Sequence, residues 1–473
     1  MEITKKHIRK KSNLSFIFII IGLFFLPFNS YDGIPVFGEF SRDSCVIFFL
    51  LASISAGFEL LLNKKLKVPY RNPIYIMLSI ILIWFFLTLF FNIIDIKDYY
   101  LKNTSGLERF ISQYVALLIS AALFLLTYYQ VFSKYDIRKI FFLIRKVFLA
   151  SFMVVSFYTF IEIAIIYLGI TQLEPLLRLF DYFPFCDVWL DFKFGRISSV
   201  TYEPPAFASY LMTIAGWMFS YIITSGKIKS FIPSILVVLF AFLSGSRSGL
   251  AVILFQLLIF LLYFIKRRSY HGKLIKIGLL LFLLGIPIII FNGKVFGEYI
   301  VNKIESFELD NSKHSTSNRS RFGMIYTSSI VFLKNPIKGV GFGQVAYESR
   351  PLYPSWATDN NWEFRDKYLN DNYEPFPPSY NLYTRILAET GIIGFGGLSV
   401  FLFVIFYVCY QKIRPPNKDS WMFLILLISF AGYAINWLQI DTFRVYGFWI
   451  CLALLLILTK GQLSFGKKKN YNG

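Results

Sequence analysis

Runs of about 20 apolar residues, separated by short polar segments, recur along the whole of this 473-residue chain. Roughly 20 such residues span the hydrocarbon core of a bilayer. Because 56% of the residues are hydrophobic, the pattern predicts a polytopic integral membrane protein rather than a soluble one.

We read residues 1–473 as a single membrane domain that crosses the bilayer about twelve times. The first run follows the basic segment KKHIRKK, as in a secretory signal, but it lacks a small-residue cleavage site and is predicted to remain as the first helix. The expected spans are 14–30, 45–63, 74–94, 110–131, 147–170, 204–224, 231–244, 249–265, 274–292, 386–410, 421–439 and 446–460.

The distribution of basic residues predicts the orientation of these spans. A cytoplasmic N-terminus places most lysines and arginines in short cytoplasmic segments, as the positive-inside rule requires. Both termini are then cytoplasmic, and residues 171–203 and 293–385 form outer loops. The second loop is much longer than the usual connection, which is typical of a functional segment.

The net charge of +20 comes largely from clusters beside the spans, such as NKKLK and IKRRSYHGK. Such clusters contact anionic head groups, so we expect membrane lipids as partners and no nucleic acid. The four cysteines and three histidines lack the spacing of metal ligands. We therefore expect no zinc site, no disulfide framework and no cofactor, which leaves arginines, carboxylates, tyrosines and amides to carry the chemistry.

Arg247 lies in the middle of the uncharged run from Phe231 to Ile265, within AFLSGSRSGLAVILF. This run is too long for one crossing, so two short crossings with SGSRSG as the turn are predicted. An arginine near membrane depth is costly and usually lines a cavity or site, although it can also reach lipid phosphate by snorkelling. With serines and glycines around it, Arg247 suits a lipid-linked phosphate or pyrophosphate at the outer face.

The smaller outer loop ends in FGRISSVTYEPPAFASYL. Pro204 and Pro205 fit the first turn of a helix, which places Glu203 at its N-terminus. One interpretation is that Glu203 stabilises the helix dipole. The other is that Glu203, with Arg196 and Tyr202, forms a polar floor where the carboxylate accepts a proton from a sugar hydroxyl.

The larger outer loop contains Arg319 and Arg321 at the start of an amphipathic helical pattern that ends near Lys334. Both arginines could reach a phosphate, although solvated surface charge explains them as well. The GVGFG that follows lacks the lysine and the strand of a phosphate loop and is predicted to be a turn. His314 is the one histidine expected on the outer side and a weak candidate for a base.

Aromatic residues are interleaved with amides and carboxylates later in the same loop. Aromatic faces beside hydrogen-bonding groups suit sugars, and an interfacial aromatic belt explains the same composition. Glu389 is expected in the first turn of the tenth span, and Tyr380 and Asn381 are expected to position sugar. The aromatic candidates are Trp356, Trp362, Tyr373, Tyr380 and Tyr383.

Three segments in this order, LSGSRSGL, NRSRFGMIYTSSIVFLKNPIKGVGFG and PPSYNLYTRILAETGIIG, resemble the O-antigen polymerase and O-antigen ligase superfamily. The similarity is densest over residues 196–400. The resemblance implies an all-helical, metal-independent, C-type glycosyltransferase fold in the bacterial inner membrane. It also implies that undecaprenyl-pyrophosphate-linked oligosaccharides are joined at the periplasmic face, and that a membrane protein regulating chain length is a partner.

In polymerases of this kind, arginines of the outer loops are thought to hold the anionic substrate, which corresponds here to Arg196, to Arg319 or Arg321, and to Arg247. Ligases of the superfamily typically carry a histidine before the asparagine of the last motif, whereas this chain has Tyr380 before Asn381. The resemblance therefore favours an O-antigen polymerase over a ligase. A lipid-linked sugar flippase is the alternative without catalysis, but transporters commonly show internal repeats and midplane sites, which this sequence does not suggest.

Overall fold

The computed structural model describes residues 14–461, apart from 65, 193, 226, 267–271, 273–274, 276–314 and 415–418. The main helices are α1 (Leu14–Phe24), α2 (Ser44–Asn63), α3 (Pro73–Phe91), α5 (Gly106–Leu118), α6 (Leu125–Phe132), α7 (Ile137–Ile166), α9 (Pro204–Thr224), α10 (Ile232–Leu243), α11 (Arg247–Ile265), α13 (Ser315–Lys334), α16 (Leu382–Ile413), α17 (Ser420–Asn436) and α18 (Tyr446–Leu458). The π-helical segment η2 (Ile119–Phe124) joins α5 to α6 without a break.

Short elements fill the connections. The strands β1 (Tyr100–Leu101) and β2 (Thr104–Ser105) form an antiparallel hairpin, in which Leu101 is paired with Thr104. The short helices are η1 (Pro35–Phe40), α4 (Ile93–Asp98), η3 (Thr171–Leu173), α8 (Glu174–Leu177), η4 (Arg178–Tyr182), η5 (Ile228–Phe231), α14 (Val345–Ser349), η7 (Arg350–Leu352), α15 (Ser355–Thr358) and η8 (Phe364–Tyr368).

The prediction of a polytopic helical membrane protein is confirmed. Seven of the described helices are long and apolar enough to cross a membrane, and four shorter apolar helices accompany them. Together these helices coincide with the predicted spans that fall in the described residues. The predicted span 274–292, residues 293–314 of the larger loop with His314, and both termini lie outside the described residues.

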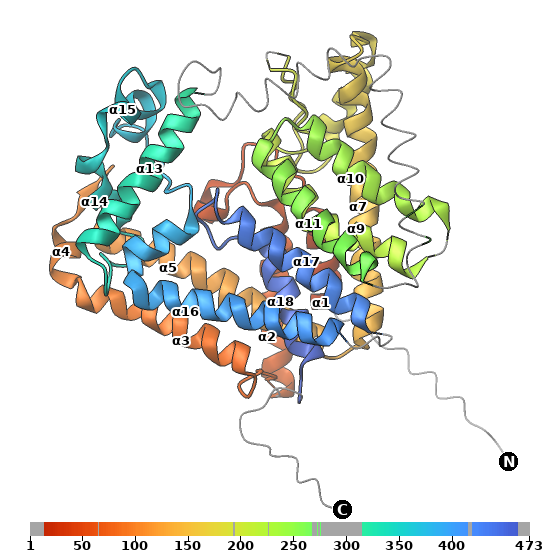
Figure 1. Cartoon of the computed structure of the whole chain (residues 1–473), viewed down its shortest axis with the longest axis horizontal. Coiled ribbons are helices and arrows are strands. Elements are labelled where there is room, and N and C mark those ends of the chain that lie inside the picture. Colours follow the sequence, from red (N-terminus) through yellow and green to blue (C-terminus); the bar gives the residue numbers. More distant parts are fainter. Residues whose placement is uncertain are drawn as a thin grey trace, which may run out of the picture.

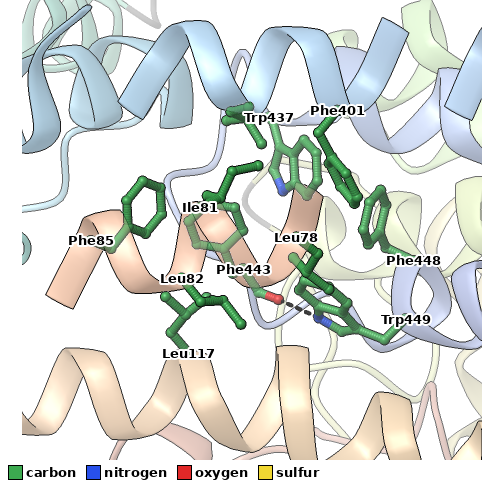
Figure 2. Close-up of a pocket in the computed structure, with 11 residues that line it drawn as sticks. Leu78, Ile81, Leu82, Phe85, Leu117, Phe401, Trp437, Phe443, Phe448 and Trp449 are labelled. Atoms are coloured by element: carbon green, nitrogen blue, oxygen red, sulfur yellow. Dashed lines mark hydrogen bonds between the residues drawn. The ribbon is translucent and has the colours of Figure 1, made fainter. Parts of the chain in front are cut away.

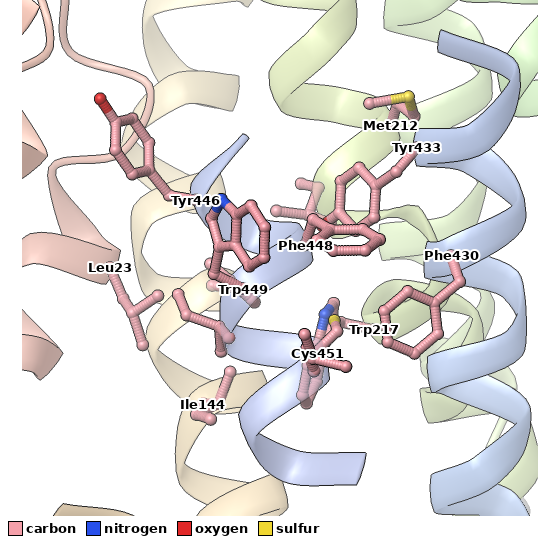
Figure 3. Close-up of a cluster of buried hydrophobic side chains, with 14 of the residues drawn as sticks. Leu23, Ile144, Met212, Trp217, Phe430, Tyr433, Tyr446, Phe448, Trp449 and Cys451 are labelled. Carbon is pink, nitrogen blue, oxygen red and sulfur yellow. The ribbon is translucent and has the colours of Figure 1, made fainter. Parts of the chain in front are cut away.

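Helix α18 forms the centre of the bundle. Its residues from Tyr446 to Leu456 are all buried, as expected for a helix that is hydrophobic on every side. Figure 3 shows Phe448, Trp449 and Cys451 of this helix facing side chains from α1, α7, α9 and α17. Inside a bilayer such packing stabilises the fold through dispersion contacts rather than through the hydrophobic effect, and this helix joins the surrounding spans in that way.

The second half of the chain adds a helical group at one end of the bundle. Figure 1 shows α13, α14 and α15 together beside α5 and the start of α16. Helix α13 packs on both α15 and α16, and its extent over Ser315–Lys334 confirms the predicted helix, although its apolar residues do not form a distinct face. These elements lie within the loop predicted at 293–385 and cover its residues 315–358.

An apolar pocket lies between α3, α5, α16 and the start of α18 (Figure 2). The indole of Trp449 at its edge donates a hydrogen bond to the backbone oxygen of Phe443 at 2.8 Å. With no charged group among its lining residues, this pocket cannot hold an anionic substrate. The lining residues are Leu78, Ile81, Leu82, Phe85, Leu117, Leu398, Phe401, Trp437, Phe443, Phe448 and Trp449.

A sharp break at Gly391 divides α16 into a short arm and a long arm. Gly391 has a φ of 66°, which disfavours residues with a side chain. The GVGFG segment packs against this break: Gly341 donates its N–H to the backbone oxygen of Glu389 at 2.9 Å. Gly339 and Gly343 also have positive φ angles, so the predicted turn is confirmed, and its contact with the break orients the start of α16.

Replacing Gly391 with alanine is expected to destabilise the protein by about 2–4 kcal/mol, because a Cβ there combines backbone strain with a clash. The added atom would lie 2.0 Å from the backbone oxygen of Ile337. Gly396→Ala is the matched control in the same helix, since a Cβ there meets no atom within 4 Å. Unfolding midpoints of the purified variants in detergent measure the effect, and equal midpoints for both would contradict the strain at Gly391.

Candidate functional site

Glu203 lies where several helices of the bundle begin. It immediately precedes Pro204 and α9, as predicted, but its side chain makes no capping hydrogen bond to the helix. The carboxylate is exposed to solvent, and protein atoms nevertheless surround it closely enough for desolvation to raise its pKa. Glu203 therefore does not cap α9 through a hydrogen bond, although its place at the N-terminus still allows the helix dipole to act on its charge.

Three arginines from different segments lie close enough for their charges to act on the Glu203 carboxylate. The charges of Arg321, Arg196 and Arg42 act against the rise in the pKa of Glu203, as does a hydrogen bond with Tyr202. The guanidinium of Arg42 lies over the Tyr202 ring, 5.4 Å from its centroid. We call this group, together with Arg247, the arginine recess.

Arg247 enters the recess from the predicted turn. Helix α10 ends at Leu243, and Ser246 caps α11 by accepting a hydrogen bond from the N–H of Gly249 at 3.3 Å. Arg247 is therefore the first residue of α11, and its Nη2 donates to Oδ1 of Asn318 at 3.0 Å. Its guanidinium also lies close enough to Arg321 for the two positive charges to repel.

Arg196 packs directly on the turn before Arg247. Its Nε donates to Oδ2 of the buried Asp191 at 3.1 Å. Gly245 has a φ of 70°, and a Cβ at that position would lie 2.9 Å from Cγ of Arg196. The glycine in SGSRSG thus allows the smaller loop and the turn to approach each other, and the contact brings Arg196 into the arginine recess.

The structure separates the two arginines of α13. Arg321 faces the recess, whereas Arg319 donates from Nε to the backbone oxygen of Trp356 at 2.6 Å and from Nη2 to that of Asp359 at 3.0 Å. Arg319 therefore fastens α15 to α13. The expectation that both arginines reach one phosphate does not fit this geometry, because side chains two residues apart point to nearly opposite sides of a helix.

Tyr380 borders the recess. The guanidinium of Arg321 lies 5.4 Å from the centroid of the Tyr380 ring, and the hydroxyl of Tyr380 is 2.5 Å from that of Tyr368. The next residue, Asn381, caps α16: its Oδ1 accepts the N–H groups of Tyr383 at 2.9 Å and Thr384 at 3.2 Å. Asn381 thus fixes the start of α16. Because its Oδ1 is used in the cap, the predicted contact with sugar would be made by its side-chain NH₂ group.

Glu389 lies inside the protein rather than at the surface of the recess. It is fully buried two turns into α16, and its Oε1 accepts a hydrogen bond from Nε of Arg385 at 3.1 Å. Arg385 also donates to Oε1 of Gln113 at 3.0 Å and to the backbone oxygen of Asp441 at 2.7 Å. The placement of Glu389 in the first turn was wrong, and the geometry gives it a structural ion pair instead of a substrate contact.

A second set of ion pairs adjoins this one. Glu39 accepts from Nη1 of Arg109 at 3.1 Å and lies 3.3 Å from Nη2 of Arg444. These two arginines share one carboxylate, and Arg385 is close enough to contribute to lowering the pKa of Glu39, although burial opposes the shift. The pairs join η1, α5 and the segment before α18.

Sequence reasoning missed two residues that shape the recess. Glu162, which is fully buried in α7, accepts the backbone N–H groups of Ser198 at 3.0 Å and Ser199 at 2.9 Å and so holds the loop that carries Arg196 and Glu203. A lone carboxylate within a predicted span was a signal for such a role. Arg42 lies outside the three similar segments, and nothing in its own surroundings distinguishes it from ordinary surface charge.

The remaining aromatic candidates are scattered. The Tyr383 hydroxyl donates to the backbone oxygen of Ala434 at 2.6 Å and joins α16 to α17. Trp356, Trp362 and Tyr373 are exposed on the helical group that includes α15. In the described part of the chain, no three His, Cys, Asp or Glu side chains cluster as metal ligands.

The arrangement as a whole suits an anion. Helices α2, α9, α11 and α16 begin beside the arginine recess, directly after Asp43, Glu203, Ser246 and Asn381. Helix N-termini carry partial positive charge, which adds to that of the arginines. Guanidinium groups bind phosphate oxygens in bidentate pairs. The recess can therefore hold a phosphate or pyrophosphate beside one carboxylate.

Replacing Glu162 with glutamine is expected to destabilise the protein by about 1–3 kcal/mol, because one of two buried N–H groups loses its acceptor. The matched control is Glu174→Gln, which removes an exposed ion pair with Arg178 and should cost less than about 0.5 kcal/mol. Unfolding midpoints in detergent and the rate of proteolysis within residues 194–203 measure both effects. Equal stability of the two variants would contradict the role of Glu162.

Residues 232–399 match the family model described as O-Antigen ligase, and this range contains Arg247, Arg321, Tyr380 and Asn381 but not Arg196 or Glu203. No curated protein matches the chain. The match confirms the resemblance drawn from the three segments, and residues 232–399 carry the domain of the O-antigen polymerase and ligase superfamily.

Proposed function

We propose that the protein is an O-antigen polymerase. It joins undecaprenyl-pyrophosphate-linked oligosaccharide repeat units into polysaccharide at the periplasmic face of the bacterial inner membrane and releases undecaprenyl pyrophosphate. The observation that supports this most is the arginine recess, in which the charges of Arg42, Arg196 and Arg321 act on the solvent-exposed Glu203. A pyrophosphate needs several cations, and the transfer of a sugar to a hydroxyl needs one proton acceptor.

The proposed reaction is a direct displacement. A hydroxyl at the non-reducing end of the incoming unit attacks the anomeric carbon of the growing chain, and the carbon–oxygen bond to the pyrophosphate breaks. Arg247 and Arg321 stabilise the negative charge that develops on the leaving group. Glu203 accepts the proton of the attacking hydroxyl. Arg196, Tyr202 and Asn381 position the substrates, and Arg319 acts through the loop that it fastens.

A ligase is the second candidate, because the matching family model is described as O-Antigen ligase. Such an enzyme would transfer finished polymer to lipid A–core instead of to another repeat unit. Tyr380 stands where ligases of the superfamily typically carry histidine, which supports the polymerase. The proposed setting has both termini in the cytoplasm, membrane lipids around the spans and a membrane protein that regulates chain length as a partner.

The test is to incubate purified protein in vesicles with lipid-linked repeat units. A ladder of products supports the polymerase. Transfer that requires an added lipid A–core acceptor would show a ligase. Movement of the substrate across vesicles without any glycosidic bond formed would show a flippase and overturn the proposal.

The two arginines of α13 provide a matched pair in this assay. Arg321→Lys is expected to lower kcat about 100-fold, because lysine cannot reproduce the bidentate contact with a phosphate in the transition state. Arg319→Lys should change kcat less than about threefold, since Arg319 contacts backbone oxygens outside the recess. Equal losses for the two variants would remove Arg321 from the proposed mechanism.

Glu203 is expected to determine how kcat depends on pH. Desolvation raises the pKa of this carboxyl above its usual value, so the fraction able to accept a proton, and with it kcat, should rise as the pH increases through that raised pKa. Glu203→Gln should lose this acidic limb and most of its turnover. Because the folded protein favours the protonated form, the substitution should not lower the unfolding midpoint at neutral pH. Unchanged turnover and an unchanged pH profile would show that Glu203 is not the base.

A further inference from the structure

The hydroxyl pair of Tyr368 and Tyr380 lies between the arginine recess and the small core of the helical group beside it. The two oxygens are 2.5 Å apart. Tyr368 is 7% exposed and packs in a cluster with Met324, Ala357 and Phe364. Tyr380 is partly exposed and lies under the guanidinium of Arg321. One hydroxyl is thus inside the protein and the other borders the recess.

The surroundings of the pair indicate which hydroxyl donates. A tyrosine hydroxyl has one hydrogen to donate, and leaving it unpaired in a buried position costs about 1–3 kcal/mol. Among the described residues, the hydrogen-bond partner of the buried Tyr368 hydroxyl is the Tyr380 oxygen. Tyr368 therefore donates to Tyr380, and the hydrogen of Tyr380 is left for the open side, where a ligand of Arg321 would lie.

Tyr380 suits a donor better than a base, because burial raises the pKa of its hydroxyl. The charges of Glu363 and Asp441 act in the same direction, whereas the hydrogen bond from Tyr368 and the charge of Arg321 lower that pKa without reversing the shift. The hydroxyl therefore keeps its proton at neutral pH. The guanidinium of Arg321 lies 5.4 Å from the centroid of the Tyr380 ring, so an anion bound to Arg321 would lie beside this tyrosine.

We propose that Tyr380 is a catalytic residue that donates a hydrogen bond to the pyrophosphate leaving group, and that Tyr368 is the residue that orients this hydrogen. The inference rests on the proposed polymerase function and goes beyond the sugar contact expected for Tyr380. No proton is transferred in this step: the carbon–oxygen bond breaks, its electron pair stays on the pyrophosphate oxygen, and Tyr380 keeps its hydrogen. The hydrogen bond strengthens as the negative charge develops, which lowers the barrier.

The experiment is a double-mutant cycle on the full-length protein in vesicles. Tyr380→Phe is expected to lower kcat about 100-fold with little change in KM, because the bond is made mainly in the transition state. Tyr368→Phe should lower kcat about tenfold, since Tyr380 then loses its orientation. In the Tyr380→Phe background, Tyr368→Phe should have no further effect, because it acts only through that hydroxyl.

Tyr353→Phe is the matched control. Tyr353 packs on Phe364 in the same small core, and its buried hydroxyl has no hydrogen-bond partner among the described residues. Its removal should leave kcat unchanged and the fold intact. If Tyr353→Phe lowers kcat as much as Tyr368→Phe does, or if the effects of Tyr368→Phe and Tyr380→Phe multiply in the double variant, the orienting role is overturned.

A binding measurement separates this inference from the proposed function. Native mass spectrometry of the same variants with undecaprenyl pyrophosphate should show about tenfold weaker binding for Tyr380→Phe and unchanged binding for Tyr353→Phe. A wild-type protein that forms no polymer overturns the polymerase function, whichever way the binding turns out. A wild-type protein that forms polymer while Tyr380→Phe retains full kcat overturns the donor role alone.

Discussion

The electrostatic balance around Glu203 is the constraint on which the rest of the site depends. One carboxylate, partly desolvated, faces Arg42, Arg196 and Arg321, which come from segments far apart in the sequence. Bringing like charges together in a membrane protein is costly unless a ligand or a counter-charge offsets it. The starts of several helices add positive potential at the same place. The recess is therefore built for an anion, and a pyrophosphate matches both its charge and the geometry of guanidinium groups.

The neighbouring ion pairs show what a purely structural arrangement looks like in the same molecule. Glu389 and Arg385 form a buried pair within α16, and Glu39 is matched by Arg109 and Arg444. There each carboxylate is held by arginines at hydrogen-bonding distance, and the pairs connect elements. In the arginine recess Arg196 is paired in the same way with the buried Asp191, but Glu203 remains exposed to solvent. The contrast supports assigning structure to the first group and substrate binding to the second.

Much of the fold could be predicted because membrane spans depend on the length of apolar runs, which is visible in the sequence. The turn before Arg247 and the helix start at Glu203 followed from glycine and proline positions. The directions in which side chains point were harder to predict. Arg319 and Arg321 were treated as a pair, although both lie within α13 (Ser315–Lys334) and so must diverge. The role of Arg42 could not be predicted from the sequence, because its place in the recess depends on contacts between distant segments.

The most direct measurement is an experimental structure of the protein with undecaprenyl pyrophosphate bound. We expect the diphosphate to lie in the arginine recess, in contact with Arg247 and Arg321, with the hydroxyl of Tyr380 turned towards it and the Glu203 carboxylate beside the position of the sugar. A diphosphate bound elsewhere, with these arginines making no contact to it, would contradict the assignment of the recess as the site of sugar transfer.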